Sequence, residues 1–236
     1  MMELKVIAYA RNGFSDKFGI PRQSREESSI VTRIVFTPDY SSPDAIRGIS
    51  DYSHLWLLWG FSANRRFRHA ESEPEQMSDS LTVRPPRLGG NTRVGVFATR
   101  SPFRPNPIGL TSVRLLRVES GELIVSGADL LDGTPIYDIK PYLSFSDSHP
   151  DACNGFAEKS RDYRLHVDWS SCVYAESDSV RKEALRRDLE EILSQDPRPA
   201  YQTDSERIYR LDYAGHTVAF KVQGDTVVVE SLNPKD

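Results

Sequence analysis

Hydrophobic and polar residues alternate in short stretches through the N-terminal part of the chain, a pattern typical of β-strands. Residues 3–10 and 30–36 alternate in this way. The run 54–61 is continuously apolar, which predicts a strand buried on both faces. Further short strands are predicted over residues 93–98, 110–118, 122–128 and 163–169. Because turn residues, not helical patterns, separate these stretches, the sequence predicts a barrel or sandwich and disfavours a doubly wound α/β sheet.

The pattern changes near residue 177. From Val180 to Leu193 the apolar positions recur at steps of three and four residues, which predicts an amphipathic helix that Pro197 ends. Three short strands are expected after it, over residues 208–212, 217–222 and 226–230. The predicted fold is therefore mainly β: a β-barrel-type domain over residues 1–169, followed by a small α+β domain over residues 170–236. The polar stretch 65–80 is predicted to be a loop.

Composition narrows the class of protein. The chain has 236 residues, of which 38% are hydrophobic and 27% charged, as in ordinary globular proteins. Its two cysteines, Cys153 and Cys172, cannot form a disulfide framework or a four-cysteine metal site. The spacing of the histidines matches no metal motif, so no metal is expected. With no signal peptide and no apolar run near the ~20 residues of a membrane helix, we expect a cytoplasmic protein.

Charge is distributed unevenly along the chain. The formal net charge is −4, yet residues 80–118 hold seven arginines and no lysine, aspartate or glutamate. Arginine binds phosphates and carboxylates through two parallel hydrogen bonds and stacks on bases. The strip therefore predicts an anion site for a nucleotide or RNA, unless its arginines pair with the acidic residues elsewhere in the chain. Charge alone does not separate these alternatives.

The same strip contains the densest set of unusual residues. Prolines and glycines crowd residues 82–91, 95–100 and 103–109. Proline restricts the backbone and glycine allows close approach, so such segments form rigid loops that present arginines and backbone N–H groups. We interpret them as a functional surface and not as the edge of a barrel alone. The chain lacks the glycine-rich dinucleotide and P-loop motifs, so the predicted anion site is of another kind.

These segments resemble those of the TsaA/TrmO family of S-adenosylmethionine-dependent tRNA methyltransferases. The similar segments follow one another in order along nearly the whole chain: Lys17–Gln23, Asp51–Trp56, Thr82–Gly109, Asp129–Pro135, Asp138–Tyr142 and Asp196–Tyr201. The resemblance implies a barrel-type domain that binds S-adenosylmethionine, a smaller C-terminal domain and a homodimer. It implies methylation of the exocyclic nitrogen of threonylcarbamoyl-adenosine at position 37, in the anticodon loop of tRNA.

The resemblance also implies a set of site residues. The cofactor site would include Pro21, Arg22, Gln23, Phe61, Ser62, Arg100, Leu110, Ser126, Gly127, Ala128 and Asp129. The remaining arginines Arg84, Arg87, Arg104 and Arg198 would bind tRNA, and Tyr142 or Tyr201 could stack on bases. For proton removal from the target nitrogen we expect Asp132, with Asn106 as an orienting acceptor. Alternatively, Asp132 only closes an Asp-Gly turn.

Two other classes of function compete with a methyltransferase. A non-catalytic RNA-binding barrel would keep the arginine strip and bind no cofactor. A small-molecule hydrolase would be insensitive to tRNA, and the chain lacks the G-x-S-x-G motif that would support it. Cofactor binding separates the methyltransferase from the RNA-binding alternative.

Overall fold

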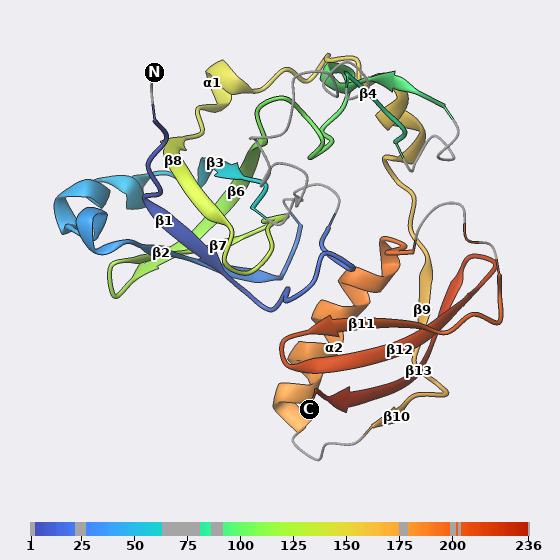
Figure 1. The fold of residues 1–236 in the computed structure, drawn as a ribbon. Helices are drawn as coiled ribbons and strands as arrows, with labels where there is room; N and C mark the ends of the chain where they lie inside the picture. The colour runs from blue at the N-terminus through green and yellow to red at the C-terminus, as the bar shows by residue number, and fades with distance from the viewer. Residues whose placement is uncertain are drawn as a thin grey trace, which may run out of the picture.

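The computed structural model describes residues 3–21, 27–62, 81–85, 92–174, 179–198, 202 and 204–235. The predicted loop 65–80 and the site residues Arg22, Gln23, Arg87 and Tyr201 lie outside these ranges. Figure 1 shows a barrel built from the N-terminal part of the chain and a separate sheet and helix built from the C-terminal part. The prediction of a mainly β fold with a barrel is confirmed.

Six strands of the described chain close the barrel in the order β1-β2-β7-β6-β3-β8. All neighbouring pairs are antiparallel, and the pairing of β1 with β8 closes the barrel, so these six strands leave no exposed edge. The strands are β1 (Ala8–Arg11), β2 (Val31–Phe36), β3 (His54–Gly60), β6 (Ile108–Glu119), β7 (Glu122–Ser126) and β8 (Pro135–Pro141). A separate two-stranded ribbon pairs β4 (Thr82–Val83) with β5 (Val94–Gly95).

Strand β3 differs from its prediction. Leu55, Leu57 and Trp59 are buried in the barrel core, whereas Trp56 and Leu58 between them are only half-buried. The expectation that both faces are buried is therefore wrong: β3 has one inward face, and its apolar outward face is partly covered. Part of that cover is the short helix α1 (Ser144–Asp147), because the Trp56 indole donates a 2.8 Å hydrogen bond to Asp147 Oδ2.

Short 3₁₀ helices occupy several connections between the strands. They are η1 (Pro38–Tyr40), η2 (Pro43–Ile46), η3 (Ile49–Asp51), η8 (Val96–Ala98) and η9 (Gly155–Ser160). The segment predicted as a strand over 93–98 contains only the two residues of β5 and then turns into η8. The loops that carry the arginine strip are thus irregular, as the density of proline and glycine indicates.

The C-terminal part forms a second sheet with one helix. Strands β11 (Tyr209–Tyr213), β12 (His216–Gln223) and β13 (Thr226–Pro234) form an antiparallel meander, and β9 (His166–Asp168) and β10 (Val173–Tyr174) add to β13 in parallel. The predicted helix is confirmed as α2 (Ser179–Ser194), which lies on the side of the sheet nearer the barrel (Figure 1). Strand β9 precedes the boundary expected at residue 170 but belongs to this sheet.

The connection between β1 and β2 links the two parts. These strands pair side by side in the barrel, yet the described residues between them, 12–21 and 27–30, leave it and extend to the second sheet and its helix (Figure 1). Phe14 and Ile30, which are 0% and 1% exposed, are buried in the core formed by α2 and β11–β13 and not in the barrel core. The N-terminal chain therefore completes the C-terminal core.

Candidate functional site

A chain of hydrogen bonds crosses the barrel from β3 to the segment after β7. The Trp59 indole donates to Thr111 Oγ1 at 2.9 Å, and Thr111 Oγ1 donates to Asp129 Oδ1 at 2.6 Å. Thr111 is 2% exposed and Trp59 7% exposed, so water does not compete for these bonds. The relay fixes the Asp129 carboxylate relative to two strands.

Aromatic packing adds Phe61 to the same group. Its ring meets the Trp59 ring edge-on at 4.4 Å between centroids, and its N–H donates to the Pro107 carbonyl at 2.9 Å. Gly109 allows this arrangement because a Cβ there would lie 2.2 Å from the Trp59 indole. Only glycine fits where β6 passes the indole, which explains one residue of the segment 103–109 in physical terms.

Residues 126–129 form a turn at the end of β7. Ser126 and Ala128 are buried, and Gly127 between them has φ +81°, a left-handed conformation that favours glycine. Ser126 lies opposite Val31 of β2 and Arg114 of β6 in the strand register. The turn therefore leads straight from the barrel wall to Asp129, and the structure brings Phe61, this turn and Asp129 together through Trp59 and Thr111.

Other expected cofactor residues lie at the surface. Leu110 is 54% exposed on the outer face of β6, opposite Leu58 of β3. Ser62 is exposed in a turn in which its N–H donates to the Gly60 carbonyl at 2.8 Å. Arg100 is exposed, and no hydrogen bond joins it to the relay among the described residues. Pro21 is buried at the end of a described segment.

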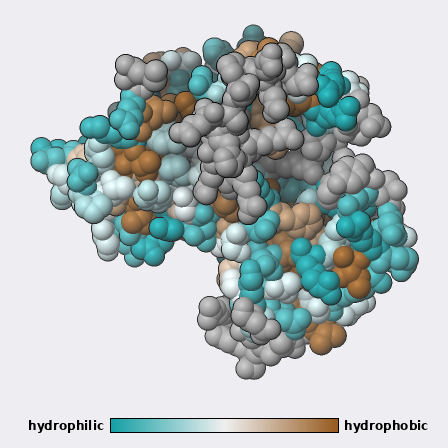
Figure 2. Space-filling view, in the orientation of Figure 1, coloured by the Kyte–Doolittle hydropathy of each residue, from teal (hydrophilic) through white to brown (hydrophobic). Residues whose placement is uncertain are grey.

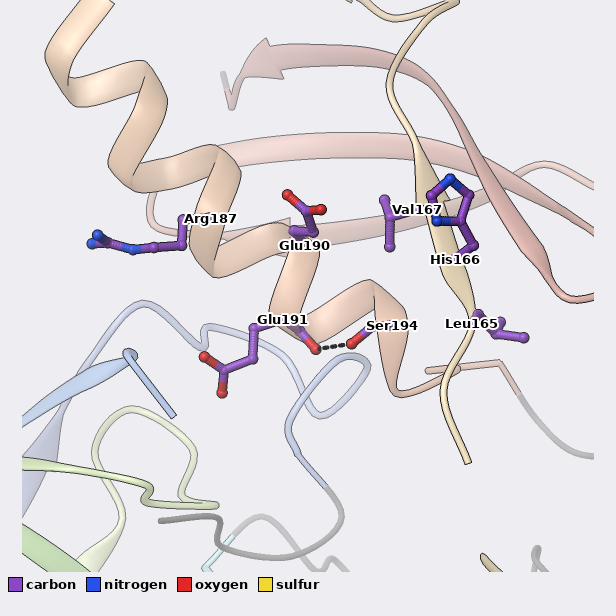
Figure 3. A pocket seen from close by; sticks show the side chains of 7 residues that line it. All are labelled: Leu165, His166, Val167, Arg187, Glu190, Glu191 and Ser194. Carbon is purple, nitrogen blue, oxygen red and sulfur yellow. Dashed lines mark hydrogen bonds between the residues drawn. The ribbon is translucent and has the colours of Figure 1, made fainter. Parts of the chain in front are cut away.

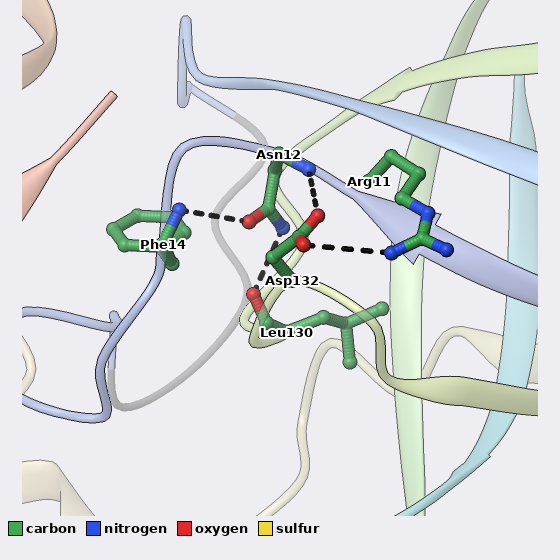
Figure 4. Close-up of polar contacts among 5 residues, drawn as sticks. All are labelled: Arg11, Asn12, Phe14, Leu130 and Asp132. Carbon is green, nitrogen blue, oxygen red and sulfur yellow. Dashed lines mark hydrogen bonds and ion pairs between the residues drawn. The ribbon is translucent and has the colours of Figure 1, made fainter. Parts of the chain in front are cut away.

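Asp132 organises the start of the β1–β2 connection (Figure 4). Its Oδ1 accepts a 3.0 Å hydrogen bond from the Asn12 backbone N–H, and its Oδ2 lies 3.5 Å from Arg11 Nη1. The Asn12 amide donates in turn to the Leu130 carbonyl at 2.9 Å. These contacts agree with the turn-closing alternative, while the 39% exposure of the Asp132 side chain leaves it open to a substrate. Asn106, the expected orienting residue, is exposed, and its carbonyl accepts from Ile108 N–H at 2.7 Å.

The arginines divide into two groups. Several arginines that lie outside the strip 80–118 pair with carboxylates, as Arg33 does with Glu122 at 2.6 Å. Within the strip, Arg117 pairs with Glu119 at 2.8 Å. The other described arginines of the strip form no ion pair with any described carboxylate: Arg84, Arg93, Arg100, Arg104 and Arg114. Within the described ranges, Arg104 donates to the Thr99 carbonyl at 3.1 Å and to no carboxylate. The described part of the strip thus favours an anion site over structural ion pairs.

Arg198 is placed differently from the other expected tRNA-binding residues. Its side chain is 14% exposed, and its Nε donates to Asp196 Oδ1 at 2.9 Å, while Tyr163 donates to Asp196 Oδ2 at 3.1 Å. Burial opposes the charge, but the Asp196 carboxylate and Tyr163 together outweigh it and raise the pKa of Arg198. This guanidinium is engaged inside the C-terminal domain.

Two hollows lie near α2. One, about 270 Å³, is lined by β9 and α2, and Figure 3 shows the Glu191 side chain extending from α2 toward the N-terminal chain. The other, about 130 Å³, lies between residues 17–21 and the C-terminal end of α2. Among the described residues no cluster of three or more His, Cys, Asp or Glu is arranged to hold a metal. No helix in the described ranges has the length and hydropathy of a membrane span.

Sequence reasoning did not single out Asn12, Trp59 or Thr111. Trp59 and Thr111 are 52 residues apart, and Asn12 lies 120 residues from Asp132. The hydrophobic patterns place Trp59 and Thr111 in strands and give no sign that their side chains meet. Knowledge that β3 pairs with β6 would have been needed to predict the contact between Trp59 and Thr111.

Comparison with known proteins supplies an independent line of evidence. Residues 9–148 match the model of the tRNA-methyltransferase O N-terminal domain, and residues 162–235 match that of the TrmO C-terminal domain. The chain is 37% identical to the tRNA (adenine(37)-N6)-methyltransferase of Escherichia coli K12, over 99% of this chain and 98% of the relative. It is 42% identical to a putative S-adenosylmethionine-dependent methyltransferase, RcsF, of Pseudomonas aeruginosa PAO1, over 83% of this chain and 81% of the relative. A crystal structure of TrmO superposes with a TM-score of 0.74 at 29% identity, covering 99% of each chain.

Proposed function

Because this chain belongs to the tRNA-methyltransferase O family, we propose that it is an S-adenosylmethionine-dependent tRNA (adenine(37)-N6)-methyltransferase. Its acceptor is the exocyclic nitrogen of threonylcarbamoyl-adenosine. The observation that carries the proposal is the set of arginines that pair with no described carboxylate, beside a barrel in which Asp129 is fixed by the Trp59–Thr111 relay. An anionic cofactor tail and an RNA backbone both need such arginines.

The described residues fit S-adenosylmethionine chemically. Arg100 is exposed and forms no ion pair with a described carboxylate, so its guanidinium suits the carboxylate tail. Asp129, held in place by Thr111, suits an amine or a ribose hydroxyl. The Ser126–Ala128 turn and Phe61 supply backbone groups and an apolar wall for adenine, and Pro21, Arg22 and Gln23 complete the proposed site.

When bound, S-adenosylmethionine supplies an electrophilic methyl group. The protein residues then have to hold the acceptor nitrogen in line with that group, and such positioning accounts for most of the acceleration in reactions of this type. The nitrogen lies between a purine and a carbonyl, so its proton is acidic. Asp132 is our candidate for the acceptor of that proton, with Asn106 as a neutral acceptor that orients the reacting group.

Replacing Asp132 with asparagine tests this role. Asparagine can still accept the Asn12 N–H through its Oδ1, so Asp132→Asn keeps the turn and removes the proton acceptor. Turnover should fall while tRNA affinity is kept. Unchanged turnover at normal tRNA affinity would exclude Asp132 as the acceptor and leave it the turn-closing role.

The tRNA would be held by phosphate contacts. Arg84, Arg104 and Arg114 have no ion pair with a described carboxylate and can bind phosphates, and Arg87 belongs to the same segment. We infer a smaller part for Arg198, because Asp196 already engages it. Since the substrate is the anticodon loop of tRNA, we infer a cytoplasmic enzyme.

We also infer a homodimer. Phe97, Phe103, Ile108 and Leu110, on β6 and the segment before it, are 76%, 44%, 37% and 54% exposed. Exposed apolar residues in such number mark interaction surfaces. On the face drawn in Figure 2, apolar side chains come to the surface in separate patches on the barrel and on the C-terminal part.

Calorimetric titration with S-adenosylmethionine tests the cofactor site. We expect saturable binding that Arg100→Ala weakens strongly. Arg117→Ala is the matched control, because Arg117 belongs to the same strip but pairs with Glu119, and it should bind as the wild type does. Absence of binding both without and with tRNA would contradict the proposal and favour a non-catalytic RNA-binding protein.

A further inference from the structure

The connection between β7 and β8, residues 127–134, crosses one end of the barrel. In the closed order of the six barrel strands, β7 and β8 lie on opposite sides, with two strands between them in either direction. The segment that joins them, here named the crossing loop, therefore passes over the end of the barrel. Its residues Ala128 and Leu130 are 3% and 0% exposed and belong to the barrel core, so the loop closes this end.

The crossing loop carries both carboxylates of the proposed reaction. Asp129 is the proposed cofactor residue, and Asp132, the proposed proton acceptor, follows three residues later. Residues 129–132 belong to no strand, so no ladder of backbone hydrogen bonds fixes one carboxylate relative to the other. Their relative placement depends instead on individual contacts with neighbouring elements.

Side chains from two opposite strands of the barrel make such contacts. Thr111 of β6 donates to Asp129 Oδ1 at 2.6 Å. Asn12, the residue directly after β1, donates through its amide to the Leu130 carbonyl at 2.9 Å. Because β1 and β6 lie on opposite sides of the closed barrel, the loop is held from both sides.

Asn12 also contacts the part of the loop that carries Asp132 (Figure 4). Its backbone N–H donates to Asp132 Oδ1 at 3.0 Å. The Asp132 N–H donates to the Phe14 carbonyl at 2.9 Å, and the Phe14 N–H donates to Asn12 Oδ1 at 2.9 Å. Asn12 therefore contacts the carboxylate of Asp132 directly and fixes the backbone on both sides of it, at Leu130 and, through Phe14, at Asp132 itself.

The amide group of Asn12 is more than a local turn requires. Asparagine and aspartate close turns of this kind equally well, because either can accept the Phe14 N–H. Only asparagine can also donate, and its Nδ2 donates to the Leu130 carbonyl and, at 3.3 Å, to Thr32 Oγ1. Leu130 is fully buried, and a buried carbonyl needs a hydrogen-bond partner. The donors of the amide thus hold the crossing loop and not the turn of Asn12 itself.

We propose that Asn12 is a positioning residue for methyl transfer, which acts through Leu130 and holds Asp132 in a fixed place relative to Asp129. This inference rests on the proposed function, which assigns the cofactor and proton-acceptor roles to these two carboxylates. A misplacement of about 1 Å in a reacting arrangement can slow a reaction about 100-fold. The contact of Asp129 with Thr111 does not involve Asn12, so loss of Asn12 should lower kcat and leave cofactor affinity nearly unchanged.

The test compares Asn12→Asp with Thr32→Val in the full-length protein. Aspartate has the shape of asparagine and keeps the acceptor for Phe14 N–H, but it places a second acceptor against the Leu130 carbonyl. We expect its kcat, at saturating S-adenosylmethionine and tRNA, to fall about 10- to 100-fold at a nearly unchanged Kd for the cofactor. Thr32→Val is the matched control, because it removes the other partner of the same amide and leaves the bond to Leu130, so its kcat should stay close to that of the wild type.

Asn12→Ala removes the same donors without adding a charge, and it should slow the reaction to a similar extent. Single-turnover rates per cofactor-binding site keep the result valid if a variant folds poorly. The sites are counted from the stoichiometry of a calorimetric titration with S-adenosylmethionine, so unfolded protein does not lower the rate per site. A merely structural Asn12 would lower thermal stability and the number of sites but leave the rate per site at the wild-type value, which would overturn the inference.

Combining Asn12→Ala with Asp132→Asn tests whether Asn12 acts through Asp132. If it does, Asn12→Ala should slow the reaction much less in the Asp132→Asn background than in the wild type, because the two residues act as a unit. The same loss in both backgrounds would mean that Asn12 acts elsewhere and would overturn the inference.

Asp132→Asn alone separates this inference from the proposed function. If Asp132→Asn slows methyl transfer and Asn12→Ala does not, the proton acceptor stands and the positioning role is overturned. If Asp132→Asn leaves kcat unchanged, Asp132 is not the acceptor and the positioning role falls with it. Slower transfer in both variants, with Thr32→Val close to the wild type, supports both.

Discussion

Replacing Thr111 with valine probes the relay that fixes Asp129. Valine has nearly the shape of threonine but no hydroxyl, so the barrel core keeps its packing. The Trp59 N–H then loses its acceptor, and the Asp129 carboxylate loses the donor that lies 2.6 Å away. Every other contact of the relay is left in place.

The size of the expected loss in stability follows from the burial of Trp59 and Asp129, the two residues that Thr111 joins. Trp59 is 7% exposed, and a buried donor left without a partner costs about 1–3 kcal/mol. A hydrogen bond to a carboxylate contributes about 1.5–3 kcal/mol. Asp129 is only partly buried, so water can replace part of what the bond from Thr111 contributes. We therefore expect Thr111→Val to lower the free energy of unfolding by about 3 kcal/mol.

Urea denaturation followed by tryptophan fluorescence measures this loss. Thr111→Ser keeps the hydroxyl and removes one methyl group, so it should lose only about 1 kcal/mol. A Thr111→Val protein as stable as Thr111→Ser would refute the relay. If the relay also serves the cofactor, Thr111→Val should bind S-adenosylmethionine more weakly than Thr111→Ser does.

Three further outcomes are expected. Gly109→Ala should lose about 1–3 kcal/mol in urea denaturation, because its Cβ would lie 2.2 Å from an indole ring, whereas Gly95→Ala, with nothing within 4 Å, should be neutral. Hydrogen bonds from Lys235 and Thr217 lower the pKa of Asp212 in the folded protein. The carboxylate therefore stabilises the fold above the ordinary pKa of 3.8, and this stability is lost as the pH falls from there through the lowered pKa. Asp212→Asn should remove this contribution to the pH dependence of acid unfolding. Arg114→Ala should reduce the slope of log tRNA affinity against log salt concentration by about one. Arg117→Ala should change this slope less, because the Arg117 guanidinium is already paired with Glu119. Equal slopes for the two variants would argue against phosphate binding by Arg114.

Residue periodicity predicted most of the fold because each main element has a one-sided apolar face. Alternation found most of the barrel strands, a continuous apolar run found β3, and the steps of three and four residues found α2. Strand β8 was not predicted because prolines stand at both of its ends, Pro135 and Pro141, and proline suggests a loop. The pattern also did not show which face of β3 is partly exposed. Both faces are apolar, and an apolar face that is partly covered has the same sequence pattern as one that is fully buried.

The candidate site was less accessible from the sequence. The arginine strip was visible, but whether an arginine pairs with a carboxylate also depends on residues that are distant in sequence, as the pair of Arg33 in β2 with Glu122 in β7 illustrates. The contacts of Phe14 and Ile30 with the C-terminal domain were hidden because they join residues that are distant in sequence. Phe14 and Ile30 complete a core whose other members lie more than a hundred residues further along the chain.

Methyl transfer to tRNA tests the central claim most directly. The protein would be incubated with labelled S-adenosylmethionine and two forms of one tRNA, with threonylcarbamoyl-adenosine or with unmodified adenosine at position 37. We predict label on the exocyclic nitrogen of the modified nucleoside and little or none on the unmodified tRNA. Label elsewhere in the tRNA, equal label on both forms, or no transfer at saturating cofactor would contradict the account.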